Sequence, residues 1–401
     1  MTAGSEDLYA AVRLARAALT RLMEPSDLVG LALIRAVGPE DALRIARGEV
    51  NAGPGIERRI ATQLDEADSL SGWQGLAPAI QRWIPRLPDL APQRDLEVIS
   101  RLGGGLLVPE DPEWPDALTD LGLVEPIALW VRGPHRQLPP LQQCVAVVGS
   151  RDSTGYGASV TADIAHGLAQ RGLTIVSGGA YGIDAQAHRA ALAGTRSGIP
   201  TIAVMAGGVD RFYPMGNEEL LRTIAREGAM IAEVPPGSNP TRYRFLQRNR
   251  LIAALCSVTV VVEARWRSGA LSTAHHADLL SRNVAAVPGS VYSANSAGCH
   301  RLLREGAAVC VTDAAEVAEL AGASGQNLAT EASGPKADHD GLNLEDLMLL
   351  DALPAVAGTT VDKLCTVAGL GLQSVLSGLG RLEIMGLAER TNGHWRRRKK
   401  A

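Results

Sequence analysis

The chain has 401 residues, of which 46% are hydrophobic and 20% charged, and its formal net charge is −4. This length predicts two or three domains with sizeable cores. No apolar run approaches the length of a membrane span, and no basic segment precedes an apolar run at the N-terminus, so we expect neither a membrane anchor nor a signal peptide. The five cysteines are scattered and odd in number, which argues against a disulfide framework or a zinc site and favours a cytoplasmic protein.

The first part of the chain, residues 1–95, has apolar residues at helical spacing and is expected to be a helical domain. A break at Val37-Gly38-Pro39 separates two helical runs. This break fits a helix-hairpin-helix, which contacts nucleic-acid backbones, and it equally fits a small bundle with a Gly-Pro turn. Residues 96–143 alternate short apolar runs with Pro and Gly and predict an extended connector with a strand or two.

Seven short runs rich in Val and Ile follow within residues 144–320, and helical segments separate most of them. Continuous apolar strands that alternate with helices predict an α/β domain with a mostly parallel, Rossmann-like sheet covered on both faces. Ligands of such sheets lie at the carboxyl ends of the strands.

The C-terminal part begins with a small and polar segment, residues 321–341, which predicts a linker. Residues 342–401 predict three helical runs followed by a short hairpin, the outline of a winged helix, with Thr359 or Thr360 as a helix N-cap.

Three of the predicted strands end in small or polar residues that could receive a phosphate. Glycine lets a ligand approach the backbone, and N–H groups at a helix start attract anions. A tight turn between strand and helix is the alternative for any one loop taken alone. The residues at these ends are Gly149, Ser150 and Arg151; Ser177, Gly178, Gly179 and Gly182; and Ser268 and Gly269.

Arginine and aromatic residues alternate in two further segments on the same expected edge. One segment carries Arg211 and Phe212, and the other, residues 241–255, carries Phe245 with Arg248, Asn249 and Arg250 and contains no acid. Phe212 and Phe245 are the only phenylalanines of the chain. Basic grooves with interleaved aromatic rings hold single-stranded nucleic acid, although the rings could instead fill space beneath the loops.

A catalytic set is not evident in the sequence. Asp184 and Glu263 are the only carboxylates at strand ends that could serve as acid or base, and we interpret both as residues that order their loops. Neither an H-x-x-x-H pair nor a G-x-S-x-G elbow is present, so we expect no metal, no cofactor and no catalysis.

The ordered set of motifs over roughly residues 100–320 resembles the DprA/Smf family. The set comprises Gly149-Ser150-Arg151, SGGAYGID, GVDRFYP with Asn217, Arg248-Asn249-Arg250, VVVEA with SGALSTA, and Pro288-Gly289. The resemblance implies a homodimeric protein that binds single-stranded DNA, protects it during natural transformation and loads the RecA recombinase onto it. It further implies DNA contacts from Arg151, Arg211, Arg248 and Arg250, with the turn from Ser177 to Gly182 along the backbone path.

Two other functions remain as alternatives. A nucleotide-hydrolysing enzyme of the lysine-decarboxylase-like group would carry a P-G-G-x-G-T-x-x-E run, but Pro288-Gly289 is followed here by Ser290, with no Glu in the next helix. A winged-helix transcriptional regulator would place basic or amide side chains on its recognition helix, and the runs LQSVLSGLG and RLEIMGLAE carry little basic charge. We therefore favour a protein-contact role for the winged helix.

Overall fold

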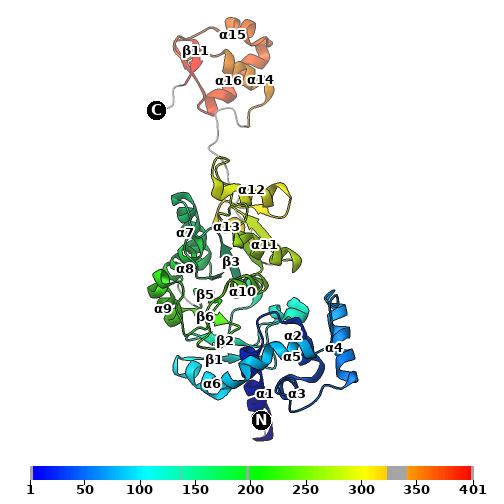
Figure 1. The fold of residues 1–401 in the computed structure, drawn as a ribbon. Helices are drawn as coiled ribbons and strands as arrows, with labels where there is room; N and C mark the ends of the chain where they lie inside the picture. Colours follow the sequence, from blue (N-terminus) through cyan, green and yellow to red (C-terminus); the bar gives the residue numbers. More distant parts are fainter. Residues whose placement is uncertain (1–2, 136, 196–197, 323–340, 399–401) are drawn as a thin grey trace. The chain divides into compact units, whose positions relative to one another are not determined.

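A computed structural model describes residues 3–135, 137–195, 198–322 and 341–398 (Figure 1). The chain divides into two compact units, Met1–Ala329 and Thr330–Ala401. Each unit is described by itself. Most of the predicted linker, residues 323–340, lies outside the described residues.

The first unit is built on a nine-stranded sheet of order β1-β2-β6-β5-β4-β3-β7-β8-β9. The strands from β6 to β9 are parallel, and β1 and β2 pair antiparallel at one edge. The strands are β1 (Gly104–Leu107), β2 (Leu129–Arg132), β3 (Cys144–Val148), β4 (Thr174–Ser177), β5 (Thr201–Val204), β6 (Ala229–Ala232), β7 (Val258–Val261), β8 (Asn283–Ala286) and β9 (Val309–Cys310). Each of the seven predicted apolar runs forms a strand, and the segment 96–143 contributes the two antiparallel strands to the same sheet.

Helices cover both faces of this sheet, as the continuous apolar strands require. One face packs against α7 (Gly155–Gln170), α8 (Ile183–Gly194) and α13 (Ala314–Ala321), with α9 (Glu218–Glu227) over β5 and β6. The other face packs against α10 (Arg242–Ala254), α11 (Gly269–Leu279) and α12 (Ala297–Arg304). Alternate residues of a strand point to opposite faces, so Ile175 and Val176 enter different cores.

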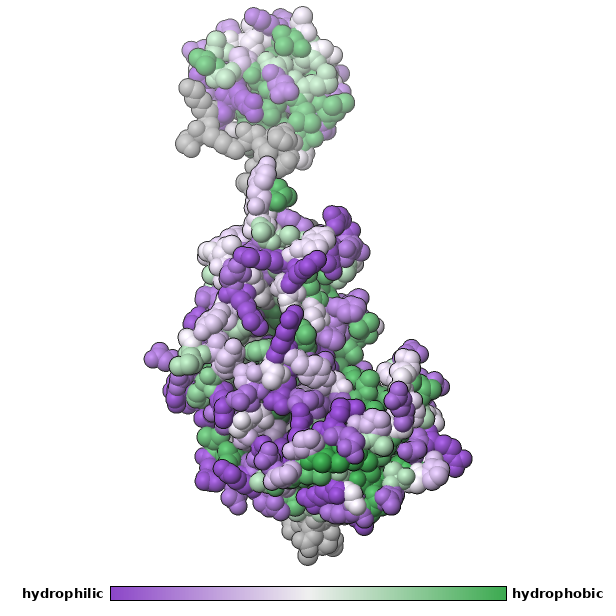
Figure 2. All heavy atoms as spheres, in the orientation of Figure 1, coloured by the Kyte–Doolittle hydropathy of each residue, from purple (hydrophilic) through white to green (hydrophobic). Residues whose placement is uncertain are grey.

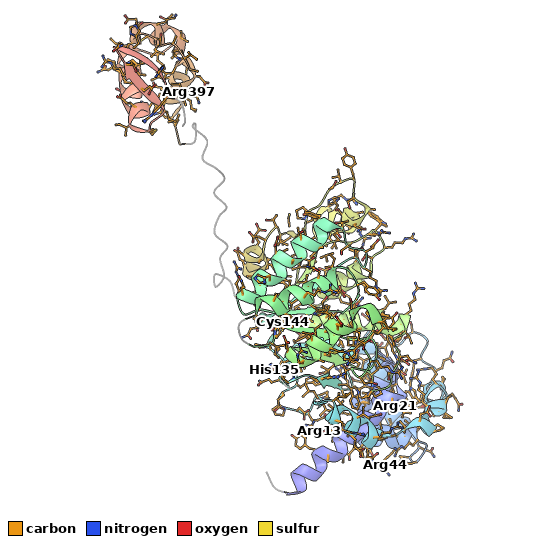
Figure 3. All side chains as sticks on the ribbon, turned by 90° about the vertical axis from the view of Figure 1, so that its left-hand side faces the viewer. Arg13, Arg21, Arg44, His135, Cys144 and Arg397 are labelled. Atoms are coloured by element: carbon orange, nitrogen blue, oxygen red, sulfur yellow. The ribbon has the colours of Figure 1, made fainter. Side chains whose placement is uncertain are left out.

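The N-terminal helices form a third core beside the sheet. They are α1 (Ala3–Leu22), α2 (Leu28–Val37), α3 (Pro39–Ala46), α4 (Pro54–Glu66) and α5 (Ala77–Trp83), while α6 (Pro92–Arg101) packs against the sheet through Leu96 and Ile99. Helix α6 continues past residue 95 into the segment expected to be an extended connector. Two arginines of α1, labelled in Figure 3, attach it to neighbouring parts of the unit: Arg13 donates to the Leu106 carbonyl at 2.8 Å, and Arg21 pairs with Asp95 at 2.6 Å and donates to the Pro236 carbonyl at 3.0 Å.

The predicted break between two helical runs lies at Gly38, which joins α2 to α3 with φ 83°. The first turn of α3 carries Glu40 and Asp41, and both are exposed. Carboxylates at this turn would repel phosphate. The small-bundle interpretation therefore describes the α2–α3 hairpin better than a contact with a nucleic-acid backbone.

The second unit contains α14 (Leu344–Ala352), α15 (Val361–Ala368), α16 (Leu372–Ile384) and a hairpin of β10 (Ala388–Thr391) and β11 (His394–Arg397). Thr360 is the N-cap residue of α15, and Thr359 bridges to Trp395 of the hairpin. The core includes Leu349, Leu379 and Trp395. Three helices and a hairpin are the elements that the sequence predicts, while assignment to the winged-helix class stays a prediction.

A bilayer-spanning helix would have to be both long and strongly apolar, and none of the helices within the described ranges meets both conditions.

Candidate nucleic-acid interface

A cavity of about 280 Å³ lies where β3, β4 and β7 end, at the carboxyl edge of the sheet. Eight of the residues expected from the sequence line it: Gly149, Ser150, Arg151, Phe245, Arg248, Asn249, Ser268 and Gly269. Segments more than 100 residues apart thus meet at one place, because parallel strands bring their following loops to the same edge. Figure 2 shows hydrophilic side chains gathered over the middle of the first unit, in the region of β3 and α10.

The cavity wall is basic. Arg151, Arg248, Arg265 and Arg267 line it against one carboxylate, Asp184. Arg265 pairs with Asp152 and donates to Asn295 Oδ1 at 2.9 Å. Arg151 and Arg267 are exposed, and within the described part of the chain neither has a carboxylate partner. Two guanidinium groups therefore face the cleft without an internal counter-charge.

The Phe245 ring lies beside these charges. The Arg151 guanidinium is 5.2 Å from the ring centroid, and the centroid of the Tyr213 ring is 5.8 Å away. Phe245 belongs to the first turns of α10 rather than to a loop, because the Thr241 hydroxyl accepts from the Arg244 N–H and starts the helix at Arg242. The ring is half-buried, and the Arg248 guanidinium is 6.0 Å from its centroid.

The turn from Ser177 to Gly182 is organised from within. Asp184 accepts hydrogen bonds from the N–H groups of Gly178 at 3.1 Å and Ala180 at 3.4 Å, and Asn217 donates to the carbonyls of Gly179 and Ala180, each at 3.0 Å. Burial raises the pKa of Asp184. The expectation that Asp184 orders this loop is confirmed.

That internal order changes the role of three predicted contacts. Ser177, Gly178 and Gly179 are buried, and Ser177 donates to the Val147 carbonyl at 2.7 Å. The Gly178 N–H that was expected to meet a phosphate already meets Asp184. These residues support the floor beneath the cleft, whereas Gly182, half-buried, stands at the start of α8 with φ 74°.

Arg248 is a buried arginine. Its guanidinium donates to the Gly178 carbonyl at 2.8 Å and to the Val204 carbonyl, and burial lowers its pKa to about 10. Arg248 lines the cavity, but its main contacts join α10 to the ends of β4 and β5. Asn249 donates to the Gly269 carbonyl at 3.3 Å and so joins α10 to α11.

Arg250 does not line the cavity. It is 3% exposed, and it forms two bonds to Glu233, at 2.5 and 2.6 Å, and donates to the Val124 carbonyl. Its neighbour Arg244 pairs with Glu24 at 2.8 Å. The absence of acids in residues 241–255 therefore overstated the free charge of α10, because the partners come from distant segments.

Arg211 and Phe212 lie beside the cavity, after β5. Arg211 is exposed and donates to Asn239 Oδ1 at 2.6 Å. The guanidinium groups of Arg132 and Arg222 are each 4.9 Å from the centroid of the Phe212 ring. The ring is half-buried and packs against the sheet core, so it is less available for stacking than an exposed ring.

Two carboxylates considered as acid or base are fully engaged. Glu263 is 1% exposed and accepts from the Thr154 N–H at 2.9 Å and the Thr154 hydroxyl at 2.5 Å. Asp184 is occupied by the loop described above. Across the described ranges, no group of three His, Cys, Asp or Glu side chains converges as a metal site would require.

Sequence reasoning missed Arg265, Trp266 and Arg267, which follow β7. Arg265 and Arg267 line the cavity, and Trp266 is 53% exposed. The signal was present as an aromatic residue between two arginines with no acid beside them, the same pattern that drew attention to the segments around Phe212 and Phe245.

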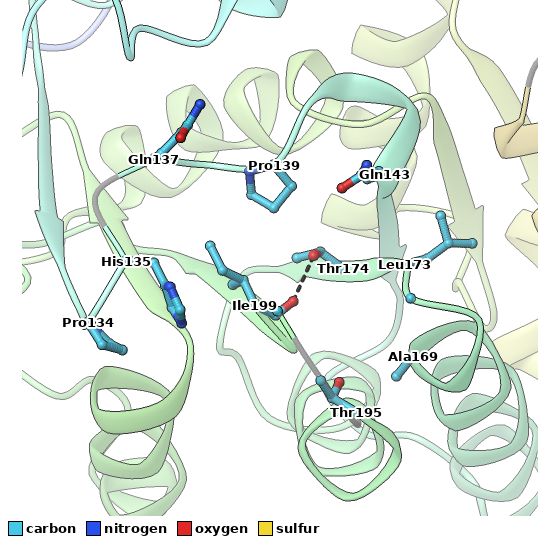
Figure 4. Close-up of a pocket in the computed structure, with 12 residues that line it drawn as sticks. Pro134, His135, Gln137, Pro139, Gln143, Ala169, Leu173, Thr174, Thr195 and Ile199 are labelled. Atoms are coloured by element: carbon cyan, nitrogen blue, oxygen red, sulfur yellow. Dashed lines mark hydrogen bonds between the residues drawn. The ribbon is translucent and has the colours of Figure 1, made fainter.

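A larger cavity of about 440 Å³ lies at the opposite, amino-terminal edge of the sheet (Figure 4). Among the described residues of its lining, His135 is the only ionisable side chain, and the Thr174 hydroxyl donates to the Ile199 carbonyl at 2.7 Å.

The fold and the site together define a Rossmann-like α/β protein with an open, arginine-lined cleft at the carboxyl edge of its sheet. The model of the DNA recombination-mediator protein A family matches residues 105–322, more than half of the chain. The chain belongs to this family, the DprA/Smf family.

Relatives support this membership over nearly the whole chain. A Mycobacterium tuberculosis protein named as a DNA processing protein DprA is 43% identical over 389 residues, covering 94% of this chain and 92% of its own. Protein Smf of Synechocystis is 33% identical, covering 78% of this chain and 85% of its own. The X-ray structure of DprA from Streptococcus pneumoniae matches with a TM-score of 0.57 and 30% identity, over 77% of this chain and 96% of that chain.

Proposed function

We propose that the cleft binds single-stranded DNA and that the protein is a non-catalytic recombination mediator. In this proposal a homodimer protects incoming strands and loads RecA onto them during natural transformation. The observation that carries the proposal is the cavity wall, where four arginines face one carboxylate and the Phe245 ring lies 5.2 Å from the Arg151 guanidinium.

The pairing of open charge with an accessible ring favours a single strand over a duplex. Arginine guanidinium groups bind phosphates in a bidentate manner, and base–aromatic stacking contributes about 1–3 kcal/mol per base. A duplex offers the phosphates but keeps its bases stacked on one another. The half-buried Phe245 ring would then have no base to stack on.

The engaged carboxylates favour binding without catalysis. A general base must reach its proton with a free lone pair and a suitable pKa. Asp184 instead accepts a bond from a backbone N–H group of its own loop, and Glu263 accepts one from the Thr154 N–H of the β3 loop. This observation supports a binding role over the nucleotide-hydrolysing alternative.

Fluorescence anisotropy of a labelled oligo-dT across a salt series tests the proposal. We expect tighter binding to the single strand than to a duplex, and weaker binding with a flatter salt dependence in Arg151→Ala/Arg211→Ala. Each lost phosphate contact lowers the slope of log K against log salt by about 0.7 for single strands. Arg171→Ala is the matched control, because this exposed arginine lies after α7, at the opposite edge of the sheet. Preference for duplex, or a double variant that matches the control, would overturn the assignment.

The partner proposals rest on family membership and have their own tests. RecA loading predicts that the protein speeds RecA ATPase activity on strands already covered by a single-strand-binding protein. Homodimer formation predicts twice the chain mass in light scattering. A monomer that binds DNA normally would separate the dimer proposal from the site proposal.

A further inference from the structure

The tyrosines of this chain are concentrated at the carboxyl edge of the sheet. Five of the six follow a strand of the parallel sheet, in the connecting loop or in the first turn of the next helix, and all five are more than 40% exposed: Tyr156 50%, Tyr181 47%, Tyr213 47%, Tyr243 44% and Tyr292 97%. Tyr9 of α1 is the exception. Trp266, the one exposed tryptophan of the six in the chain, lies on the same edge.

The sheet order places most of these rings in a row. The loops after β5, β4, β3, β7 and β8 are consecutive along the edge, because these strands are neighbours in that order. Tyr213 follows β5, Trp266 follows β7 and Tyr292 follows β8. Phe245 contacts the loop after β3, because the Arg151 guanidinium of that loop lies over its ring. The row spans four strand spacings, roughly 19 Å at about 4.8 Å each.

Direct contacts connect the loops that carry the row. Tyr213 and Phe245 are 5.8 Å apart, and the Tyr181 hydroxyl accepts from the Gly216 N–H at 3.2 Å. Further along, Arg265 of the β7 loop pairs with Asp152 of the β3 loop. The Tyr156 hydroxyl donates to the Pro288 carbonyl at 2.6 Å, which fixes the start of the β8 loop.

The outer rings have no structural task within the described chain. Trp266 has one face toward Arg301, whose guanidinium is 5.3 Å from the ring, and is otherwise open. Tyr292 is 97% exposed, so its ring packs against almost nothing. Tyr243 differs, because its hydroxyl donates to the Pro25 carbonyl at 2.9 Å and attaches it to the N-terminal helices. Aromatic rings held between arginines and exposed to solvent are the surface that unpaired bases stack on.

We propose that Trp266 and Tyr292 form a second base-stacking site beyond the cavity, so that the strand runs across the carboxyl edge from Tyr213 over Phe245 to Tyr292. This inference rests on the proposed function and adds the direction and the length of the path that the DNA strand follows. Arg151 and Arg267 hold phosphates between the rings. The DNA strand therefore crosses the β-strands at right angles, and the whole site binds several nucleotides.

Length-dependent binding tests this site. Affinity is measured for oligo-dT of about 4 and about 16 nucleotides, the range of known single-strand site sizes, and for a long abasic strand that keeps phosphates but lacks bases. Trp266→Ala/Tyr292→Ala is expected to weaken long oligo-dT about tenfold or more and to leave the short and the abasic strands within about twofold. Trp266→Phe/Tyr292→Phe should restore binding, and Tyr9→Ala is the control for an exposed tyrosine elsewhere.

The outcomes separate this inference from the function on which it rests. Arg151→Ala should weaken the long oligo-dT and the abasic strand alike; if it weakens neither, the proposed function itself fails. If Arg151→Ala behaves as expected but the double aromatic variant binds long oligo-dT like wild type, the second site is wrong. It is also wrong if that variant loses affinity equally for the abasic strand, or if its only change is a lower mass in light scattering, which would make these rings a contact between two copies.

Discussion

Two arginines that the sequence assigned to the same site have opposite roles. Arg151 is exposed and pairs with no carboxylate in the described ranges, while Arg250 is 3% exposed and bonded to Glu233. Loss of one partner of a buried ion pair costs about 3–5 kcal/mol, because the remaining charge stays buried. Removal of an exposed, unpaired arginine costs little.

These roles predict different effects of the same substitution. Arg250→Ala should lower the free energy of unfolding by about 3–5 kcal/mol, with little direct effect on the DNA affinity of the protein that remains folded. Arg151→Ala should weaken single-strand binding and leave the melting temperature unchanged. Thermal unfolding and anisotropy on both variants check this, and equal melting temperatures would contradict the structural role of Arg250.

His188 predicts an acid sensitivity of the sheet domain. The ring is fully buried, its Nδ1 lies 2.7 Å from the Thr201 hydroxyl oxygen, and its Nε2 has no partner among the described residues. Burial lowers the pKa of His188 to about 3, and the positive charges of Arg248 and Arg189 add to the effect. The unfolded chain therefore binds more protons between pH 3 and the ordinary value of 6.5.

The stability contribution of neutral His188 is thus complete above pH 6.5 and is lost as the pH falls toward 3. We expect a slope of up to about 1.4 kcal/mol per pH unit from this residue. Denaturant unfolding followed by the near-UV signal, at several pH values between 7 and 5, measures this slope. His188→Gln should reduce the slope, and an unchanged slope would assign the sensitivity to other groups.

The junction of β4, its turn and α8 depends on backbone geometry. Gly182 has φ 74°, and a Cβ there would lie 2.2 Å from the Ser150 carbonyl oxygen. That contact joins the two loops that form the floor of the cleft. The geometry therefore tolerates only glycine at this position.

Gly182→Ala should displace the Ser150 loop and weaken single-strand binding at least tenfold, with a stability loss of about 1–3 kcal/mol from the strained backbone. Gly155→Ala is the matched control at the start of the neighbouring helix α7, where an added Cβ meets nothing within 4 Å. Anisotropy measures the affinity of both variants, and thermal unfolding measures their stability. Wild-type affinity in Gly182→Ala would show that the cleft floor does not position the strand.

Helix α10 also forms an ion pair with the N-terminal region of the chain. Glu24 accepts from Arg244 at 2.8 Å and from Arg86 at 2.6 Å. Burial raises the pKa of Glu24, but the hydrogen bonds and charges of the two arginines outweigh it and leave the pKa lowered. Its stabilising effect is therefore present above the ordinary value of 4.5 and is lost as the pH falls below it.

Glu24→Gln should lower the free energy of unfolding by about 1 kcal/mol at pH 7 and have less effect at pH 4. The expected consequence for function is modest, because Phe245 and Arg248 keep their own contacts with the sheet. Thermal unfolding at both pH values measures the difference. The same loss at both pH values would show that the ion pair does not hold α10.

At the scale of the whole molecule, the sheet could be predicted and the partners of its charges could not. Seven apolar runs identified the strands. All of them except β9 are largely buried on both faces and therefore show no alternation of apolar and polar residues. The ordering role of Asp184 also followed from its place after a strand. Glu24 and Glu233 could not be matched to Arg244 and Arg250 from sequence, since their proximity depends on how the N-terminal helices and β6 meet α10.

The separation into two units leads to a final prediction. Every residue assigned to the cleft or to the aromatic row lies in the first unit. On α16 of the second unit, Leu372, Leu376 and Ile384 are exposed. Gln373 and Arg381 are the only side chains of this helix of the basic and amide types that read base edges, and Arg381 is paired with Asp346. A chain that ends at residue 322, the end of the family match, should bind oligo-dT within about twofold of the full chain and with the same salt slope. A loss of more than tenfold would place a DNA contact in the second unit and would require its hairpin arginines, Arg390 and Arg396, to be tested next.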